Sequence, residues 1–141
     1  MLSLSQTAGY AILALSCLND PDEEWVLEKT IANETGIARP YLSKILYGLA
    51  RAGLIVSKRG YKGGLTLARP AIEISILDVS NAVDGDEWWK KCLLGLPQCS
   101  DERPCPIHDF WAAIRPKIVA KFQSFSLAEV REFRKRGWRL S

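Results

Sequence analysis

The sequence predicts a mainly α-helical chain with a small β-hairpin wing, in which a winged helix-turn-helix is followed by a long dimerisation helix. Two predicted helices, residues 27–35 and 40–52, are joined by a few residues around Gly36, as in a helix-turn-helix. Two β-prone runs at 54–57 and 65–68 then flank a basic, glycine-rich connector, which is typical of a hairpin. A hairpin that directly follows a helix-turn-helix makes a winged helix.

Helices on either side of this unit are expected from periodicity and from residues that begin or end helices. Apolar residues at helical spacing predict a first helix over 5–18, which Pro21 cannot continue. Ser75 and Asp78 have the spacing of a capping box, and they predict the start of a fourth helix that ends at Gly85.

The last third of the chain is expected to contain a loop and two helices. Residues 86–107 have weak periodicity, several prolines and three cysteines, so we expect mainly loop. A long helix is expected over 109–125, with a kink at Pro116. Ser126 and Glu129 have capping-box spacing and predict a last short helix, which runs to about residue 136.

The long helix carries an apolar stripe that suits packing on another helix. Its members are spaced three or four residues apart, and they are Trp111, Ile114, Ile118, Phe122 and Phe125. An amphipathic helix at the end of a small DNA-binding domain is a natural interface for a homodimer. The alternative is that the stripe packs on its own domain.

Charge is distributed unevenly along the chain. From Thr35 to Ile72 there is no Asp or Glu, whereas this stretch contains Arg39, Lys44, Arg51, Lys58, Arg59, Lys62 and Arg69. Such a stretch is a candidate phosphate-facing surface, and the alternative is a solvated basic face without a partner. The predicted DNA-contacting residues lie on the 40–52 helix, just before it and on the wing, and they are Arg39, Tyr41, Ser43, Lys44, Tyr47, Arg51, Lys58, Arg59, Tyr61 and Lys62.

Four potential metal ligands follow within a short segment. Cys92, Cys99, Cys105 and His108 are separated by six, five and two residues, and His108 is the only histidine of the chain. Thiolates bind soft metals or iron–sulfur clusters, and imidazole is a competent fourth ligand. Structural zinc, metal-free redox thiols and unremarkable cysteines remain alternatives, and spacing alone does not choose between zinc and a cluster. Cys17 is expected in the core.

The cysteines are also informative about the compartment. No apolar run approaches the ~20 residues of a membrane span, and the N-terminus has no signal-peptide pattern. We therefore expect a cytoplasmic protein, in which cysteines are reduced thiols or metal ligands rather than disulfides.

Several motifs together resemble the IscR/NsrR-type family of bacterial iron–sulfur winged-helix regulators. The similar segments are the helix Ile37-Ala-Arg-Pro-Tyr-Leu-Ser-Lys-Ile-Leu46 and the wing Arg59-Gly-x-x-Gly-Gly-x-x-Leu-Ala-Arg69, and the likeness continues through the cysteine loop into the long helix. The resemblance implies a homodimer that binds inverted-repeat promoter DNA, most often as a repressor. It also implies one cluster per subunit, whose state sets DNA affinity in response to cluster supply, iron, nitric oxide or redox stress.

Carried over by position, the resemblance assigns the cluster to Cys92, Cys99 and Cys105. His108 matches the histidine ligand of the [2Fe–2S] type, which is therefore favoured over [4Fe–4S]. Other members use an acid where this chain has Ala8, and alanine cannot ligate. The first cysteine gap is one residue longer than in the best-known members. Arg59 resembles the arginine that the family inserts into the minor groove.

The predicted protein therefore has three parts: a DNA-binding winged helix-turn-helix at 1–85, a cluster-binding loop at 86–107, and the dimerisation and C-terminal helices at 108–141. Its predicted function is transcription regulation controlled by an iron–sulfur cluster. The alternatives are a regulator with structural zinc or a thiol switch, and a small electron-transfer protein, which leaves the basic wing unexplained. An enzyme with a Cys–His nucleophilic pair has no supporting third residue or pocket motif, so no enzymatic activity is expected.

Overall fold

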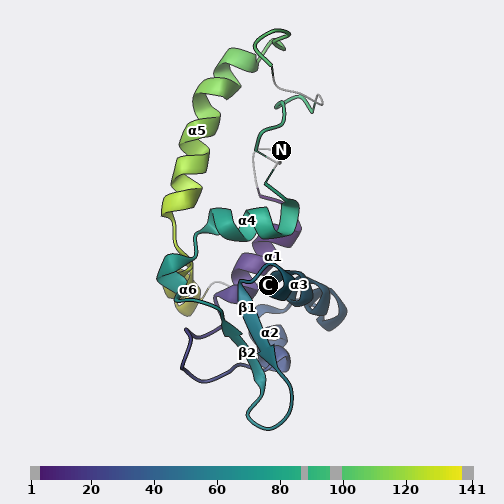
Figure 1. Ribbon diagram of the computed structural model, residues 1–141, viewed down its shortest axis with the longest axis vertical. Coiled ribbons are helices and arrows are strands. Elements are labelled where there is room, and N and C mark those ends of the chain that lie inside the picture. Colours follow the sequence, from purple (N-terminus) through teal and green to yellow (C-terminus); the bar gives the residue numbers. More distant parts are fainter. Residues whose placement is uncertain (1–3, 87–88, 96–99, 138–141) are drawn as a thin grey trace.

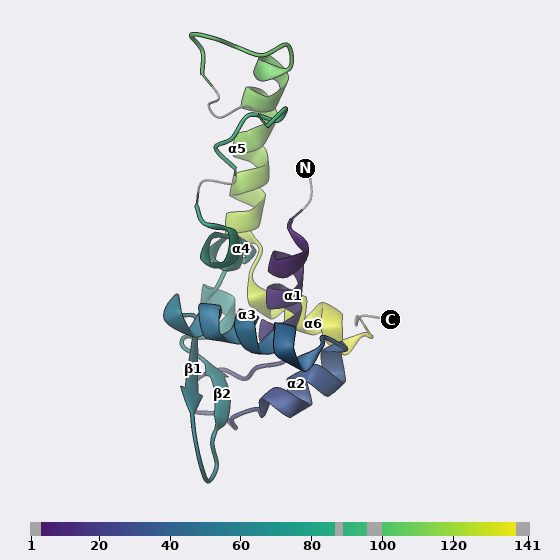
Figure 2. The same cartoon turned by 90° about the vertical axis from the view of Figure 1, so that its right-hand side faces the viewer.

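The computed structural model describes residues 4–86, 89–95 and 100–137. Its elements in chain order are α1 (Gln6–Leu15), α2 (Glu28–Thr35), α3 (Arg39–Arg51), β1 (Ile55–Lys58), β2 (Gly64–Leu67), the 3₁₀ turn η1 (Ala71–Glu73), α4 (Ile76–Asp84), α5 (His108–Ser124) and α6 (Leu127–Lys135). The hairpin of β1 and β2 projects at one end of the molecule, and α5 extends toward the other (Figures 1 and 2). This arrangement confirms the predicted winged helix with a long helix attached.

Most predicted elements are present, with shifts at their ends. The first helix ends at Leu15 rather than residue 18, because the chain tightens into turns in which the Leu18 N–H bonds the Leu15 carbonyl at 3.0 Å. Gly36 ends α2 in the left-handed conformation, with φ 80°, as expected. The η1 turn was not predicted, since three residues are too short to show periodicity. In the described parts of 86–107 there is no helix or strand, in agreement with the loop prediction.

The hairpin depends on two adjacent glycines. Gly64 has φ 140°, and a Cβ added there would lie 2.7 Å from the Val26 carbonyl oxygen. A Cβ on Gly63 would overlap the carbonyl oxygen of Lys58. Close approach is needed because Val26 and Leu65 exchange two backbone hydrogen bonds, of 2.9 and 2.8 Å, that tie the wing to the chain before α2. No other residue fits at these two positions without displacing the neighbouring backbone.

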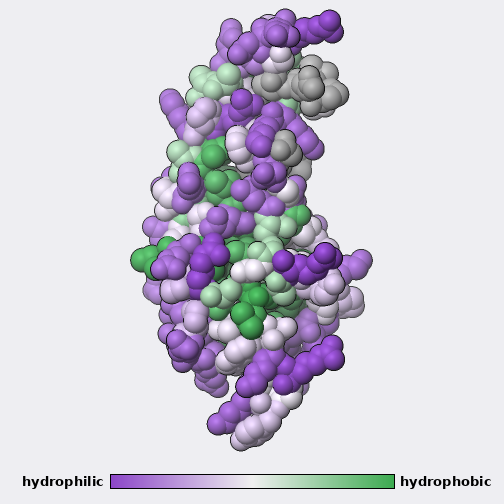
Figure 3. Space-filling model, viewed as in Figure 1, coloured by the Kyte–Doolittle hydropathy of each residue, from purple (hydrophilic) through white to green (hydrophobic). Residues whose placement is uncertain are grey.

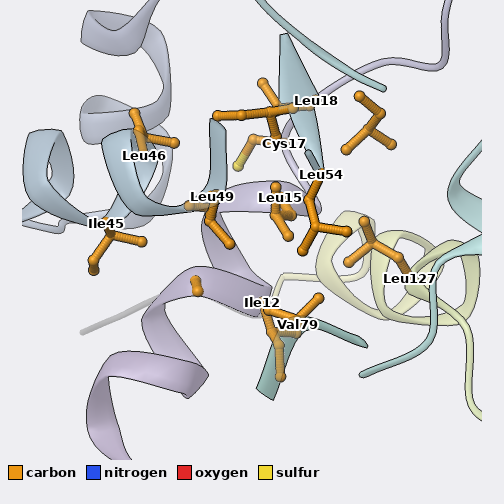
Figure 4. Packing of buried hydrophobic residues seen from close by; sticks show 14 of the residues in the cluster. Ile12, Leu15, Cys17, Leu18, Ile45, Leu46, Leu49, Leu54, Val79 and Leu127 are labelled. Carbon is orange, nitrogen blue, oxygen red and sulfur yellow. The ribbon is translucent and has the colours of Figure 1, made fainter. Parts of the chain in front are cut away.

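An apolar core joins the N-terminal helices to α6. Ile12, Leu15, Leu49, Leu54, Val79 and Leu127 converge from α1, α3, α4, α6 and the segment leading into β1 (Figure 4). Cys17 is buried in this core, as predicted. The α6 helix is also held by polar contacts, because Arg131 donates to the Leu18 carbonyl at 2.8 Å and pairs with Asp20 at 2.9 Å.

The α5 helix runs continuously through Pro116. Trp111 is buried, and its indole N–H donates to the Lys91 carbonyl at 3.0 Å. The other stripe residues, Ile114, Ile118, Phe122 and Phe125, are half-buried in the single chain. Among the described helices, none combines the length and the apolar character that a membrane crossing requires.

Candidate DNA-binding surface and cysteine site

The α3 helix separates its apolar and polar residues onto two faces. Leu42, Ile45 and Leu49 are buried in the core. The opposite face exposes five of the six predicted DNA-contacting residues of this helix, namely Arg39, Ser43, Lys44, Tyr47 and Arg51. The Arg51 guanidinium lies 5.9 Å from the centre of the Tyr47 ring, a cation–π geometry.

Tyr41 lies apart from this exposed set. Its side chain is half-buried, its hydroxyl shares a hydrogen bond with Thr7, and its ring meets Tyr10 edge-on at a centroid distance of 5.5 Å. These contacts join α1 to α3. Tyr41 thus positions the α3 helix, and its hydroxyl is already engaged within the protein.

An acidic residue that the sequence argument left out lies beside this face. Glu28, at the start of α2, accepts a hydrogen bond from the Ser43 hydroxyl, and its other carboxylate oxygen lies 3.5 Å from the Arg39 guanidinium. Glu28 precedes the acid-free stretch of the chain, so a linear charge count does not place it here. In the sequence, the only indication of its place was the expected helix over 27–35, which puts Glu28 in the helix before α3.

The wing presents its predicted residues to solvent. Lys58, Arg59, Tyr61 and Lys62 are all exposed, Tyr61 to 88%. The Lys62 ammonium lies 5.7 Å from the Tyr61 ring centre. On the face seen in Figure 3, the end of the molecule at which the hairpin lies combines hydrophilic residues with residues of near-neutral hydropathy. Charge and exposure together make the wing accessible to a nucleic acid groove.

The structure brings two of the predicted metal ligands together. The sulfurs of Cys92 and Cys105 lie 3.5 Å apart, next to the start of α5, and Cys92 is buried. Two thiolates on one tetrahedral metal ion are ~3.8 Å apart when each metal–sulfur bond is ~2.3 Å. This pair therefore fits a shared soft metal or cluster. Cys99, the third predicted ligand, lies outside the described residues.

His108 is buried at the first turn of α5, and its Nε2 atom lies 2.7 Å from a carboxylate oxygen of Asp101. Within the described parts of the chain, no three His, Cys, Asp or Glu side chains are grouped closely enough to hold a metal ion. The donor chemistry thus fits a thiolate-bound centre at Cys92 and Cys105. Ligation through Nε2 of His108 requires this ring to leave Asp101.

Cys17 differs chemically from the cysteines of the loop. Burial raises the pKa of its thiol from 9.0 to about 12. At pH 9 the Cys17 thiolate is therefore expected to be roughly five hundredfold scarcer than that of an ordinary thiol. We expect iodoacetamide at pH 9 to leave Cys17 unmodified in the folded protein and to modify it in 8 M urea, which peptide mass spectrometry would measure. Rapid modification in the folded protein would contradict this assignment.

Comparison with known proteins now decides the family. A family model described as Rrf2, an iron-dependent transcriptional regulator, matches residues 4–132. The chain belongs to the Rrf2 family. A transcriptional regulator of Aquifex aeolicus is 29% identical over 128 residues and covers 89% of each chain. The regulator IscR of Vibrio vulnificus is 33% identical over 100 residues, which are 71% of this chain and 59% of that protein.

The fold of this Rrf2 protein is also found among solved structures. The structure of CymR, the global cysteine regulator of B. subtilis, matches with a TM-score of 0.75 and 24% identity, over 94% of this chain and 98% of that one. At this identity the match establishes the fold, a winged helix. The relatives are transcriptional regulators rather than enzymes, so this Rrf2 protein is a transcriptional regulator.

Proposed function

We propose that this Rrf2 regulator is a homodimer that binds inverted-repeat promoter DNA as a repressor, and that an iron–sulfur cluster sets its DNA affinity. The ligands would be Cys92, Cys99, Cys105 and His108, with a [2Fe–2S] cluster favoured. The single observation that supports this proposal most strongly is the 3.5 Å separation of the Cys92 and Cys105 sulfurs beside α5.

When bound, a cluster would supply a centre that responds to redox state, iron supply or nitric oxide. The chain's own contacts explain how the loop can act on α5. The Lys91 carbonyl accepts the Trp111 indole N–H at 3.0 Å, and the Lys90 carbonyl accepts a hydrogen bond from Arg115 at 3.3 Å. Residues just before Cys92 are therefore fastened to α5, so ordering Cys92 also orders the proposed dimer helix.

Regulation requires that the free energy of DNA binding differs between the protein with an ordered cysteine loop and the protein in which that loop is released. A coupling of ~1.4 kcal/mol between the loop and the DNA-binding surface changes DNA affinity tenfold. Because α4 packs on α1, α3 and α5, a movement of α5 can reach the α3 helix through α4. The sign of the coupling is set by which arrangement of α5 spaces the two α3 helices to match the DNA half-sites.

One alternative has an observation in its favour. Two thiols 3.5 Å apart need little movement to form a disulfide, and the B. subtilis protein of the same fold is a global cysteine regulator. In a thiol switch, Cys92 and Cys105 would lose two protons and two electrons to a peroxide, which is reduced to water. Such a protein would be colourless.

The visible absorption spectrum of protein purified without oxygen tests the proposal, with iron, sulfide and zinc assayed on the same sample. A brown protein with matching iron and sulfide would support the cluster, and the band shape would separate [2Fe–2S] from [4Fe–4S]. A colourless protein with one zinc ion per chain would contradict cluster sensing. A metal-free sample that takes up no cluster on reconstitution, and forms the Cys92–Cys105 disulfide with peroxide, would favour the thiol switch.

Arg59 is expected to contribute strongly to DNA affinity, because it is exposed at the wing and resembles a minor-groove arginine. Arg59→Ala should weaken operator binding about tenfold and reduce the slope of log affinity against log salt by about one per protomer. Arg136→Ala, at the end of α6, is the matched control and should change neither quantity. Fluorescence anisotropy titrations at several salt concentrations would measure both. Equal effects of the two substitutions would argue against a wing contact.

A further inference from the structure

The first turn of α2 holds the beginning of α3 through one side chain. Glu28 accepts the Ser43 hydroxyl through one carboxylate oxygen and lies 3.5 Å from the Arg39 guanidinium through the other. Its side chain is 30% exposed, against 53% for Arg39. One carboxylate of the first helix of the helix-turn-helix therefore contacts two polar residues of the second. The α2 and α3 helices pack against each other near the hairpin (Figure 2).

We propose that Glu28 is a positioning residue for DNA recognition. Its carboxylate holds Ser43 and Arg39 in the orientation in which they meet the DNA, and its negative charge opposes binding that depends on phosphates alone. This inference rests on the proposed DNA-binding function and assigns within it a residue outside α3 and the wing.

The need for such a residue follows from the start of α3. Residues at the N-terminus of a recognition helix contact base edges, yet here the preceding Ala38 provides no side-chain cap. Arginine loses considerable rotamer freedom when it binds, so an arginine held before binding loses less. A carboxylate that contacts both Arg39 and Ser43 provides this preorganisation.

The position of the charge supports the second part of the proposal. Glu28 lines a hollow of about 300 Å³ between α3 and the hairpin, together with Ser43, Tyr47, Ser57 and Gly64. A charge at this hollow would face DNA that the α3 helix and the wing contact at the same time. Negative charge there repels every phosphate backbone equally, so only a sequence that gains base contacts offsets the repulsion. Glu28 should therefore lower affinity for random DNA more than affinity for the operator.

The experiment begins with a duplex selected by the wild-type protein from a random-sequence pool. Dissociation constants are then measured for this duplex and for a shuffled duplex of the same composition, at several salt concentrations and with matched metal content. The variants are Glu28→Gln, which keeps an oxygen acceptor for Ser43, and Glu28→Ala, which does not. Ser43→Ala removes only the hydroxyl contact. Glu132→Gln removes the same charge from an exposed side chain of α6 and is the matched control.

We expect Glu28→Ala to lower the ratio of selected to shuffled affinity about tenfold. Part of this change should be tighter binding of shuffled DNA, with a salt slope steeper by about one per protomer as Arg39 becomes available to phosphates. Glu28→Gln should steepen the salt slope but retain part of the ratio of selected to shuffled affinity. Ser43→Ala should lower this ratio and leave the salt slope unchanged. A merely structural role would weaken binding to both duplexes equally.

Two results would overturn the inference. In the first, Glu28→Gln and Glu28→Ala have no more effect on the affinity ratio and the salt slope than the control Glu132→Gln. Glu28 then does not position the DNA-contacting residues, although the protein still binds DNA specifically. If the wild-type protein enriches no sequence from the pool, the proposed function itself fails and the inference fails with it. Glu28→Gln preserves the size of the side chain, so the test does not depend on the folding of Glu28→Ala.

Discussion

Cys92→Ser is expected to abolish the iron and sulfide content of the protein, along with any dependence of DNA affinity on cluster state. Cys92 is buried and its sulfur lies 3.5 Å from that of Cys105. Serine is nearly isosteric, but its hydroxyl is a hard donor that stays protonated at neutral pH, so it does not replace a thiolate on iron. The loss should exceed tenfold in bound iron, since a cluster missing one ligand is open to solvent and to dissociation.

The matched control for this prediction is Cys17→Ala. Cys17 is equally buried but lies in the apolar core, where its thiol donates to the Leu13 carbonyl at 3.6 Å. The control should keep its colour and iron while losing about 1 kcal/mol of stability from the small cavity. Iron and sulfide assays on both variants, purified in parallel without oxygen, would measure the difference. Retention of full iron in Cys92→Ser would exclude Cys92 as a ligand.

Gly64→Ala is expected to cause a large loss of stability through the attachment of the wing. The backbone at Gly64 has φ 140°, a region that is essentially restricted to glycine, and such strain costs about 1–3 kcal/mol for any other residue. The added Cβ would also lie 2.7 Å from the Val26 carbonyl oxygen. Relief of this contact requires the Val26–Leu65 bridge to open, which frees the wing from the chain before α2.

The consequence should appear in both stability and DNA binding. Urea unfolding followed by circular dichroism should give a free energy of unfolding lower by about 2–4 kcal/mol, from the strain together with one or two lost hydrogen bonds. Gly9→Ala is the control, because Gly9 lies within α1 and a Cβ there meets nothing within 4 Å. It should stabilise the protein by about 0.5–1 kcal/mol. Wild-type stability in Gly64→Ala would show that the bridge does not constrain the wing. Both variants must be compared at one protein concentration, since the proposed dimer is concentration-dependent.

Local patterns were enough to predict the helices and the hairpin of this Rrf2 protein. The signals used for this prediction act over only a few neighbouring residues. They are helical periodicity, the capping box of Ser75 and Asp78, and helix-ending glycines such as Gly36. Their effects can therefore be read from neighbouring positions. The errors lie at the ends of elements. The first helix ends at Leu15 because the following residues form turns, in which the Leu18 N–H bonds the Leu15 carbonyl, although Cys17 and Leu18 continue its buried face.

The candidate site was predictable in its residue types but not in its geometry. The exposed basic residues of α3 were predictable because they alternate with an apolar stripe of helical spacing, and those of the wing because they lie in a basic, glycine-rich stretch without acids. Sequence reasoning grouped Tyr41 with them, whereas contacts with Thr7 and Tyr10 place that side chain between α1 and α3. It also missed Glu28, whose contacts reach Arg39 and Ser43 in the following helix.

By itself, then, the sequence determined the order and type of the elements, the basic stretch and the cysteine run. Only the tertiary structure decided that Glu28 lies among the basic residues, that Val26 anchors the wing, and that α6 closes the core beside α1. The physical reason is the range of the interactions. Propensity and periodicity act over one or two turns, whereas the angle between packed helices brings together side chains that no local pattern relates.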